Sequence, residues 1–223
     1  MAMSPEDSHP SGSYLVSPTS GPSFAREVLR RNDLDADPLR QFAWWFQEAC
    51  KGGETDPAAM VLATVDPDGA AQARTVSLKE VDARGFIFTS HYAGPKGRDI
   101  DAEPRVALVF YWPNAGRQVR VTGVAERLPS AESARYFEAR PPAMQGTLHV
   151  YPPSQPVPNR DALTQAAKAL ASAHGDVLTR PAWGGYVVRP LTIEFWQGQA
   201  DRLHDRFRYE ARSEGWELSR LAP

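Results

Sequence analysis

The chain has little cysteine and no long apolar run, and both shortages exclude classes of protein. Cys50 is the only cysteine among 223 residues, which excludes an internal disulfide framework and a cysteine-based zinc cluster. No apolar stretch approaches the roughly 20 residues that a membrane-spanning helix needs. We therefore predict a cytoplasmic protein with no membrane partner.

An excess of charge of one sign is also missing. Lysine and arginine number 25 and aspartate and glutamate 27, which leaves a net charge of −2. A nucleic-acid partner is not expected, because such binding usually depends on broad neutralisation of phosphates. The chain is 42% hydrophobic, and its length is enough for one substantial core. We expect a small-molecule substrate.

Residues 1–23 are rich in serine, proline and glycine. They have neither a basic start nor a continuous apolar segment, so they do not resemble a signal peptide. We predict a disordered tail over residues 1–23 and a single ordered domain over residues 24–223.

The ordered part is predicted to be mainly β with helices around it. Asp37 and Pro38 provide an N-cap and a first helical residue, and Gly52-Gly53 ends that helix. The other predicted helices are 96–102, 130–139 and 161–173, and the predicted strands are 60–65, 72–81, 85–90, 105–112, 118–126, 185–188, 191–198, 202–210 and 216–220. This spacing favours an antiparallel barrel or sandwich.

The segment from Phe195 to Arg206 combines aromatic rings, guanidinium groups and an imidazole. In a hairpin, Arg202, His204 and Arg206 would project from one face at every second residue and could bind a planar anionic ligand. The alternative is an ordinary solvated strand face. Alternation by itself favours that alternative, because exposed charges are common on antiparallel sheets.

A second cationic pair lies on the strand predicted at 72–81. Arg74 could bind a phosphate through two parallel hydrogen bonds, whereas Lys79 offers a point charge. The two are five residues apart and therefore face opposite sides of a regular strand. A β-bulge would be needed for both to reach one ligand, and simple surface solubility is the alternative.

Motifs across nearly the whole ordered chain carry a family resemblance. They are residues 29–34, 37–39, 59–66, 74–79, 117–119, 136–137, 140–141, 183–185, 195–206 and 220–223. Taken together, they resemble the pyridoxamine 5′-phosphate oxidase family. The resemblance implies an antiparallel split β-barrel of the mainly β (α+β) class. It also implies a homodimer that holds flavin mononucleotide (FMN) at the subunit interface.

The resemblance also implies roles for individual residues. Arg202 and His204 match the catalytic positions that flank the substrate ring, and Lys79, Tyr136 and Arg140 match the positions that bind the substrate phosphate. The implied cofactor-binding residues are Arg74, Thr75, Val76, Ser77, Thr89, Ser90, Lys96, Gln118, Ser154, Trp196 and Arg206. The implied reaction oxidises pyridoxamine or pyridoxine 5′-phosphate to pyridoxal 5′-phosphate and reduces O2 to H2O2, without a metal.

Two departures from the family pattern leave the substrate open. Pro95 stands where the family usually has an arginine before the lysine, and Met144 stands where it tends to place a serine on the substrate phosphate. The chain is also similar to the flavin oxidases of phenazine biosynthesis, which act on dihydrophenazine carboxylates. A third possibility is a non-catalytic split-barrel protein that binds flavin or deazaflavin.

Overall fold

The structure is a computed structural model that describes residues 27–173 and 180–223. The tail predicted over residues 1–23 lies outside the described residues. Within the described part, no helix is long and apolar enough to cross a membrane.

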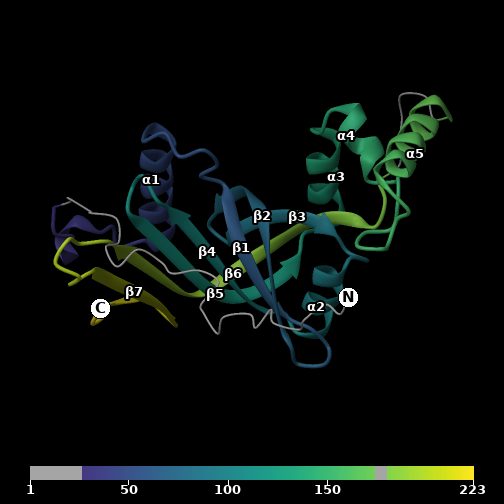
Figure 1. Cartoon of the computed structure of the whole chain (residues 1–223). Coiled ribbons are helices and arrows are strands. Elements are labelled where there is room, and N and C mark those ends of the chain that lie inside the picture. The colour runs from purple at the N-terminus through teal and green to yellow at the C-terminus, as the bar shows by residue number, and fades with distance from the viewer. Residues whose placement is uncertain (1–26, 174–179) are drawn as a thin grey trace, which may run out of the picture.

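Six antiparallel strands form a closed barrel (Figure 1). They are β1 (Ala59–Val65), β2 (Ala71–Asp82), β3 (Gly85–His91), β4 (Arg105–Trp112), β5 (Arg117–Arg127) and β6 (Trp183–Gln197), in the order β3-β2-β1-β4-β5-β6. The pairing of β3 with β6 closes the barrel, and β7 (Asp205–Arg212) and β8 (Gly215–Arg220) extend the sheet beyond β6. The predicted split barrel is confirmed.

The barrel interior is filled by alternate side chains and closed at one end by α1 (Pro38–Lys51). On β4, Phe110 and Trp112 are buried while Tyr111 between them is exposed. Phe42 of α1 lies edge-on to Phe86, with 4.9 Å between ring centroids. This helix belongs to the same core as the barrel, because Phe42 lies in one buried cluster with the barrel side chains. Burying one such ring contributes about 1.5–3 kcal/mol.

The predicted start of α1 is confirmed in its details. The Asp37 carboxylate accepts a hydrogen bond from the Leu39 backbone amide at 2.9 Å, and Pro38 is the first helical residue. Helix α2 (Pro95–Ala102), α3 (Ser130–Glu138) and α5 (Arg160–Ala173) also lie within one residue of their predicted bounds. The six-residue α4 (Pro142–Thr147) was not predicted, because it is too short to show a helical period.

Strand β6 is continuous where two strands were predicted on either side of Pro190. Proline has no backbone N–H and is normally excluded from a central strand. Here β3 pairs with β6 only up to Val188, and β7 begins to pair at Thr192. Pro190 therefore lies between the part of β6 that pairs with β3 and the part that pairs with β7. No backbone N–H is needed on that edge at this position.

The strand predicted at 202–210 begins later than expected. Strand β7 starts at Asp205, and Arg202 has a φ of 67°, which is turn geometry. The Asp201 carboxylate accepts a hydrogen bond from the Leu203 amide at 2.9 Å and so stabilises this turn. The prediction that Arg202, His204 and Arg206 alternate along one strand is therefore wrong, because the first two lie in the preceding loop.

Candidate active site

The predicted site residues form two groups at opposite ends of β6. The Arg140 guanidinium lies 5.2 Å from the ring centroid of Trp183, the first residue of β6. The His204 ring lies 4.8 Å from that of Trp196, next to its last residue. The 15 residues of β6 extend roughly 45 Å at about 3.3 Å each.

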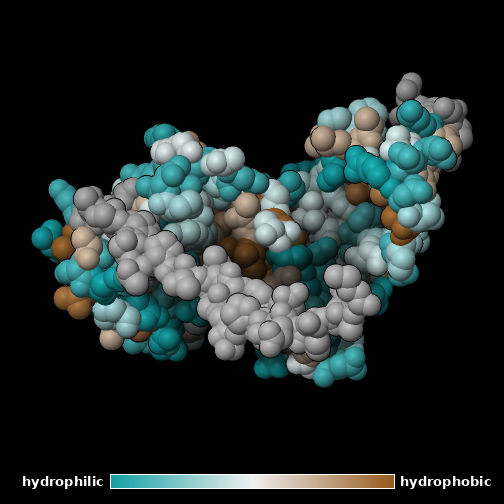
Figure 2. Space-filling view, in the orientation of Figure 1, coloured by the Kyte–Doolittle hydropathy of each residue, from teal (hydrophilic) through white to brown (hydrophobic). Residues whose placement is uncertain are grey.

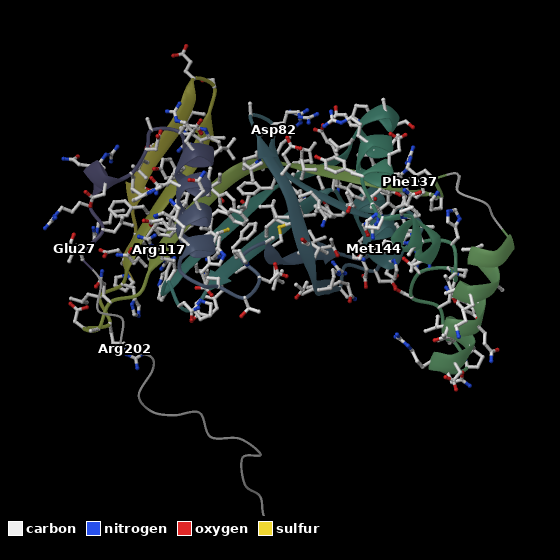
Figure 3. The ribbon with its side chains drawn as sticks, turned by 90° about the horizontal axis from the view of Figure 1, so that it is seen from above. Glu27, Asp82, Arg117, Phe137, Met144 and Arg202 are labelled. Carbon is white, nitrogen blue, oxygen red and sulfur yellow. The ribbon has the colours of Figure 1, made fainter. Side chains whose placement is uncertain are left out.

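Figures 1 and 3 show the same separation, with α3 and α4 at one end of the sheet and β7 at the other. In Figure 3, Phe137 and Met144 lie at the end opposite to Arg202. A single chain therefore does not bring the predicted catalytic pair to the predicted phosphate-binding residues.

The first group contains a compact cationic cluster beside α2. Arg74 donates to the Thr64 hydroxyl at 2.6 Å and forms a 3.3 Å ion pair with the buried Asp99. Burial and the nearby Arg74 charge lower the pKa of Lys96. Lys96 forms no hydrogen bond or ion pair with any residue of the described ranges. A bound anion would offset the electrostatic free energy that is needed to hold this second cation beside Arg74.

Other predicted residues surround the start of α2. Thr89 and Ser90 are near the end of β3, and Ser90 is buried. Ser154 has a φ of 63°, and its neighbour Pro153 lies against Gly94, 3.5 Å from where a Cβ would stand. The loop carrying Ser154 is thus packed onto the turn before Lys96. Pro95 is the first residue of α2 and offers no N–H there.

A β-bulge is present on β2, at Lys79. Leu78 pairs with Phe88 and Glu80 with Ile87, so Lys79 has no partner in the ladder. Lys79 and Glu80 are both exposed, while Leu78 is buried. Lys79 therefore lies on the exposed face of β2, away from Arg74, whose guanidinium is held by Thr64, and the bulge places Glu80 on that face as well.

The rest of this strand divides between two environments. Val76 packs against the barrel core, and Thr75 is exposed on the opposite side. Ser77 accepts a 3.4 Å hydrogen bond from the Lys79 ammonium. Of the predicted cofactor contacts on β2, only Thr75 and Ser77 lie on the face that carries Lys79.

Helix α3 places Tyr136 beside Glu80, the neighbour of Lys79, and Arg140 follows the helix beside Trp183. The Tyr136 hydroxyl donates to the Glu80 carboxylate at 2.6 Å. Burial, followed by the bond to Glu80, raises the Tyr136 pKa to about 12, so the hydroxyl keeps its proton. The Arg140 Nε atom is buried and has no hydrogen-bond partner among the described residues. It is therefore an unsatisfied donor, the kind of group that a bound anion would satisfy.

The second group forms a row across three strands. Gln118 of β5 pairs with Trp196 of β6, which pairs with Arg206 of β7. The Arg206 guanidinium is held by Glu194 at 2.9 Å and by the Ala222 carbonyl at 2.8 Å. An amide, an indole and a fixed guanidinium thus lie side by side, which suits a flat ring with polar edges.

The loop between β6 and β7 completes this group. His204 Nδ1 accepts the Gln199 backbone N–H at 3.0 Å, so the neutral imidazole carries its proton on Nε2. The adjacent Asp205 is 1% exposed and accepts bonds from the Leu29 amide at 2.9 Å and from Gln199 Nε2 at 2.6 Å. It also forms an ion pair with Arg220.

Sequence reasoning missed the supporting carboxylates Asp99, Glu194 and Asp205. Each is at most 7% exposed and bonded to an arginine. The available signal was the position of Asp205, a charged residue at an inward-facing position of an alternating strand.

Comparison with known proteins identifies the family of this chain. The family model described as pyridoxamine 5′-phosphate oxidase matches residues 46–173. The chain belongs to the pyridoxamine 5′-phosphate oxidase family. A second model, described as the pyridoxine 5′-phosphate oxidase C-terminal dimerisation region, matches residues 183–223, which carry β6 to β8 and thus the whole second group except Gln118.

Curated relatives cover almost the full chain. The pyridoxine/pyridoxamine 5′-phosphate oxidase of Rubrobacter xylanophilus is 47% identical over 202 residues, covering 90% of this chain and 93% of the relative. The corresponding protein of Ralstonia pickettii is 45% identical and covers 90% and 95%.

Solved structures with the same fold include a flavin-binding protein and a phenazine-binding one. PhzG of Burkholderia lata, in complex with tetrahydrophenazine-1-carboxylic acid, superposes with a TM-score of 0.83 at 30% identity, covering 88% of this chain and 98% of that one. A pyridoxamine 5′-phosphate oxidase-related, FMN-binding protein of Nostoc punctiforme has a TM-score of 0.68 at 17% identity, covering 83% and 98%, a likeness of fold alone.

Proposed function

We propose that this protein is an FMN-dependent oxidase that converts pyridoxamine or pyridoxine 5′-phosphate to pyridoxal 5′-phosphate. The observation that carries the proposal is the pairing of two chemically different groups, one cationic and one aromatic, in a chain of this family. For the amine, the overall reaction consumes O2 and water and releases ammonia and H2O2. For the alcohol, the substrate loses two hydrogens to O2.

The cationic cluster fits the phosphate of FMN. Lys96 is half-buried beside Arg74 and has no hydrogen-bonding or ion-pairing partner among the described residues. Burial and Arg74 outweigh the attraction of Asp99, so a phosphomonoester would offset a charge that the protein compensates only in part. Thr89 and Ser90 near the end of β3, and Ser154 in the loop that packs on Gly94, offer hydroxyl donors around the start of α2. Because Pro95 supplies no N–H, we expect weaker retention of FMN than an arginine there would give.

The aromatic row fits the isoalloxazine ring and the ribityl chain. Gln118, Trp196 and Arg206 lie in register across β5, β6 and β7. When bound, FMN would accept the hydride from the C4′ carbon of the substrate and pass the electrons to O2.

The two groups would meet across a homodimer. The separation along β6 prevents one chain from placing both groups on one flavin, and a second copy, related by two-fold symmetry, can supply the missing group. The match of residues 183–223 to a dimerisation region supports this arrangement. Each of two sites would then contain Arg74 and Lys96 from one subunit and Gln118, Trp196 and Arg206 from the other.

The remaining residues would bind and orient the substrate. Lys79, the Tyr136 hydroxyl and the Arg140 guanidinium would hold its phosphate. Arg202 and His204 would hold the pyridine ring against the flavin, which converts an encounter into an oriented transfer. The Gln199 amide fixes the His204 tautomer, so Nε2–H is the donor offered to the ring substituents.

A second candidate, oxidation of a reduced phenazine carboxylate, has one specific observation in its favour. The well-superposing PhzG structure holds tetrahydrophenazine-1-carboxylic acid. The predicted phosphate ligands Lys79, Tyr136 and Arg140 favour the B6 substrates instead, since a phosphomonoester dianion needs more than one cationic donor.

Oxygen consumption by the FMN-loaded protein tests the proposal. We expect turnover and a matching yield of H2O2 with pyridoxine 5′-phosphate, and little with tetrahydrophenazine-1-carboxylic acid. The reverse preference would establish the second candidate. Tight FMN binding without turnover of either compound would indicate a flavin-binding module.

A further inference from the structure

Glu80 is a carboxylate at the place where the proposed function puts the substrate phosphate. It follows Lys79 directly on β2 and accepts the Tyr136 hydroxyl at 2.6 Å. The bulge at Lys79 leaves both side chains on the exposed face of the strand. Glu80 forms no ion pair within the described ranges. Among the described residues, the Tyr136 hydroxyl is the one group that hydrogen-bonds this carboxylate.

The Tyr136 hydroxyl can serve only one acceptor at a time. Its pKa, raised to about 12 by burial and by Glu80, keeps one proton on the oxygen at neutral pH. The ring packs against the buried cluster of Ile87, Leu128 and Val187, which restricts its movement. A phosphate that needs this donor must therefore take it from Glu80, and it must approach a carboxylate of the same sign.

We propose that Glu80 is a specificity-determining residue that weakens the binding of dianionic substrates relative to uncharged ones. It acts by competing for the Tyr136 hydroxyl and by offsetting the Lys79 charge. This inference rests on the proposed function, which assigns Lys79, Tyr136 and Arg140 to the substrate phosphate.

The test compares wild type with Glu80→Gln on pyridoxine 5′-phosphate and on unphosphorylated pyridoxine. Glutamine keeps the size and an acceptor oxygen but removes the charge. We expect the KM for the phosphorylated substrate to fall about tenfold, because a carboxylate placed beside a phosphate of the same sign weakens binding by roughly that factor or more. We expect kcat, and the KM for pyridoxine, to stay as in wild type.

Two further variants separate this effect from a general one. Glu126→Gln removes an exposed carboxylate of β5 that pairs with Arg189, and it should leave both KM values unchanged. In a Tyr136→Phe background the gain from Glu80→Gln should shrink, because the shared hydroxyl is gone.

An unchanged or higher KM for the phosphorylated substrate in Glu80→Gln would overturn the inference, as would equal shifts for both substrates. These results leave the proposed function intact as long as wild type oxidises pyridoxine 5′-phosphate. A wild-type protein that neither binds nor oxidises it would overturn the proposed function and this inference together.

Discussion

Replacing Lys96 by methionine should have opposite effects on the flavin-free protein and on its affinity for FMN. The folded protein holds this ammonium half-buried beside Arg74, and both conditions lower its pKa below the ordinary 10.5. A lysine with a lowered folded-state pKa destabilises the fold at every pH where it stays charged in the unfolded chain. Methionine keeps the stem and removes the charge, so the melting temperature of the flavin-free protein should rise.

The same change should weaken FMN binding. A charge-assisted hydrogen bond to a phosphate contributes about 1.5–3 kcal/mol, which corresponds to a roughly tenfold to 150-fold increase in Kd. Quenching of flavin fluorescence during a titration gives the Kd, and thermal unfolding without FMN gives the stability. Lys51→Met is the matched control, because Lys51 is exposed at the end of α1.

The reasoning would be refuted by a Lys96→Met protein that is less stable without FMN and binds FMN as wild type does. That result would mean that Lys96 is held by the fold itself and not reserved for an anion. A loss of stability together with loss of FMN would instead indicate general misfolding, which the circular dichroism spectrum and the unfolding cooperativity of the variant would reveal.

Three further predictions follow from the site. Lys79→Met should lose about 1.5–3 kcal/mol of binding free energy for pyridoxine 5′-phosphate and little for pyridoxine, measured as the ratio of the two kcat/KM values; equal losses would contradict a phosphate contact. Arg202→Ala should lower kcat/KM while the FMN titration stays unchanged, because we assign Arg202, in the loop between β6 and β7, to the substrate; loss of FMN instead would reassign it. The pKa of His91 is lowered by burial and then by Lys96, Arg140 and His149, so folding is favoured while His91 is neutral. Stability should fall below about pH 6.5, the ordinary value for histidine, and His91→Gln should reduce that fall in thermal unfolding scans.

Most of the fold could be predicted from local sequence patterns. The N-cap at Asp37 and the run of β-branched and aromatic residues in β4 depend only on neighbours in the chain, and both were predicted correctly. The continuity of β6 could not be predicted, because whether Pro190 breaks a strand depends on where β3 and β7 end along it.

The sequence nominated candidate site residues but could not show how the fold arranges them. The motif around Arg202 and His204 nominated both residues, yet the turn that carries them depends on a hydrogen bond to the Asp201 side chain. A bulge at Lys79 was recognised as a requirement for Lys79 and Arg74 to reach one ligand, but Lys79 still lies on the exposed face, and the bulge instead exposes Glu80 beside it. Glu80 and Tyr136 are 56 positions apart in the chain, so no local sequence pattern could predict the hydrogen bond between them.

Complementation between two variants of low activity tests the central claim most directly. Arg140→Ala removes a residue at the Trp183 end of β6, and Arg202→Ala removes one from the loop at the Trp196 end. If each site takes one end from each subunit, unfolding and refolding the two variants together gives mixed dimers with one intact site. We predict recovery of about a quarter of wild-type activity, the value for random pairing of two-fold dimers. Activity that stays at the level of the separate variants, with mixed dimers present, would contradict a site shared between subunits.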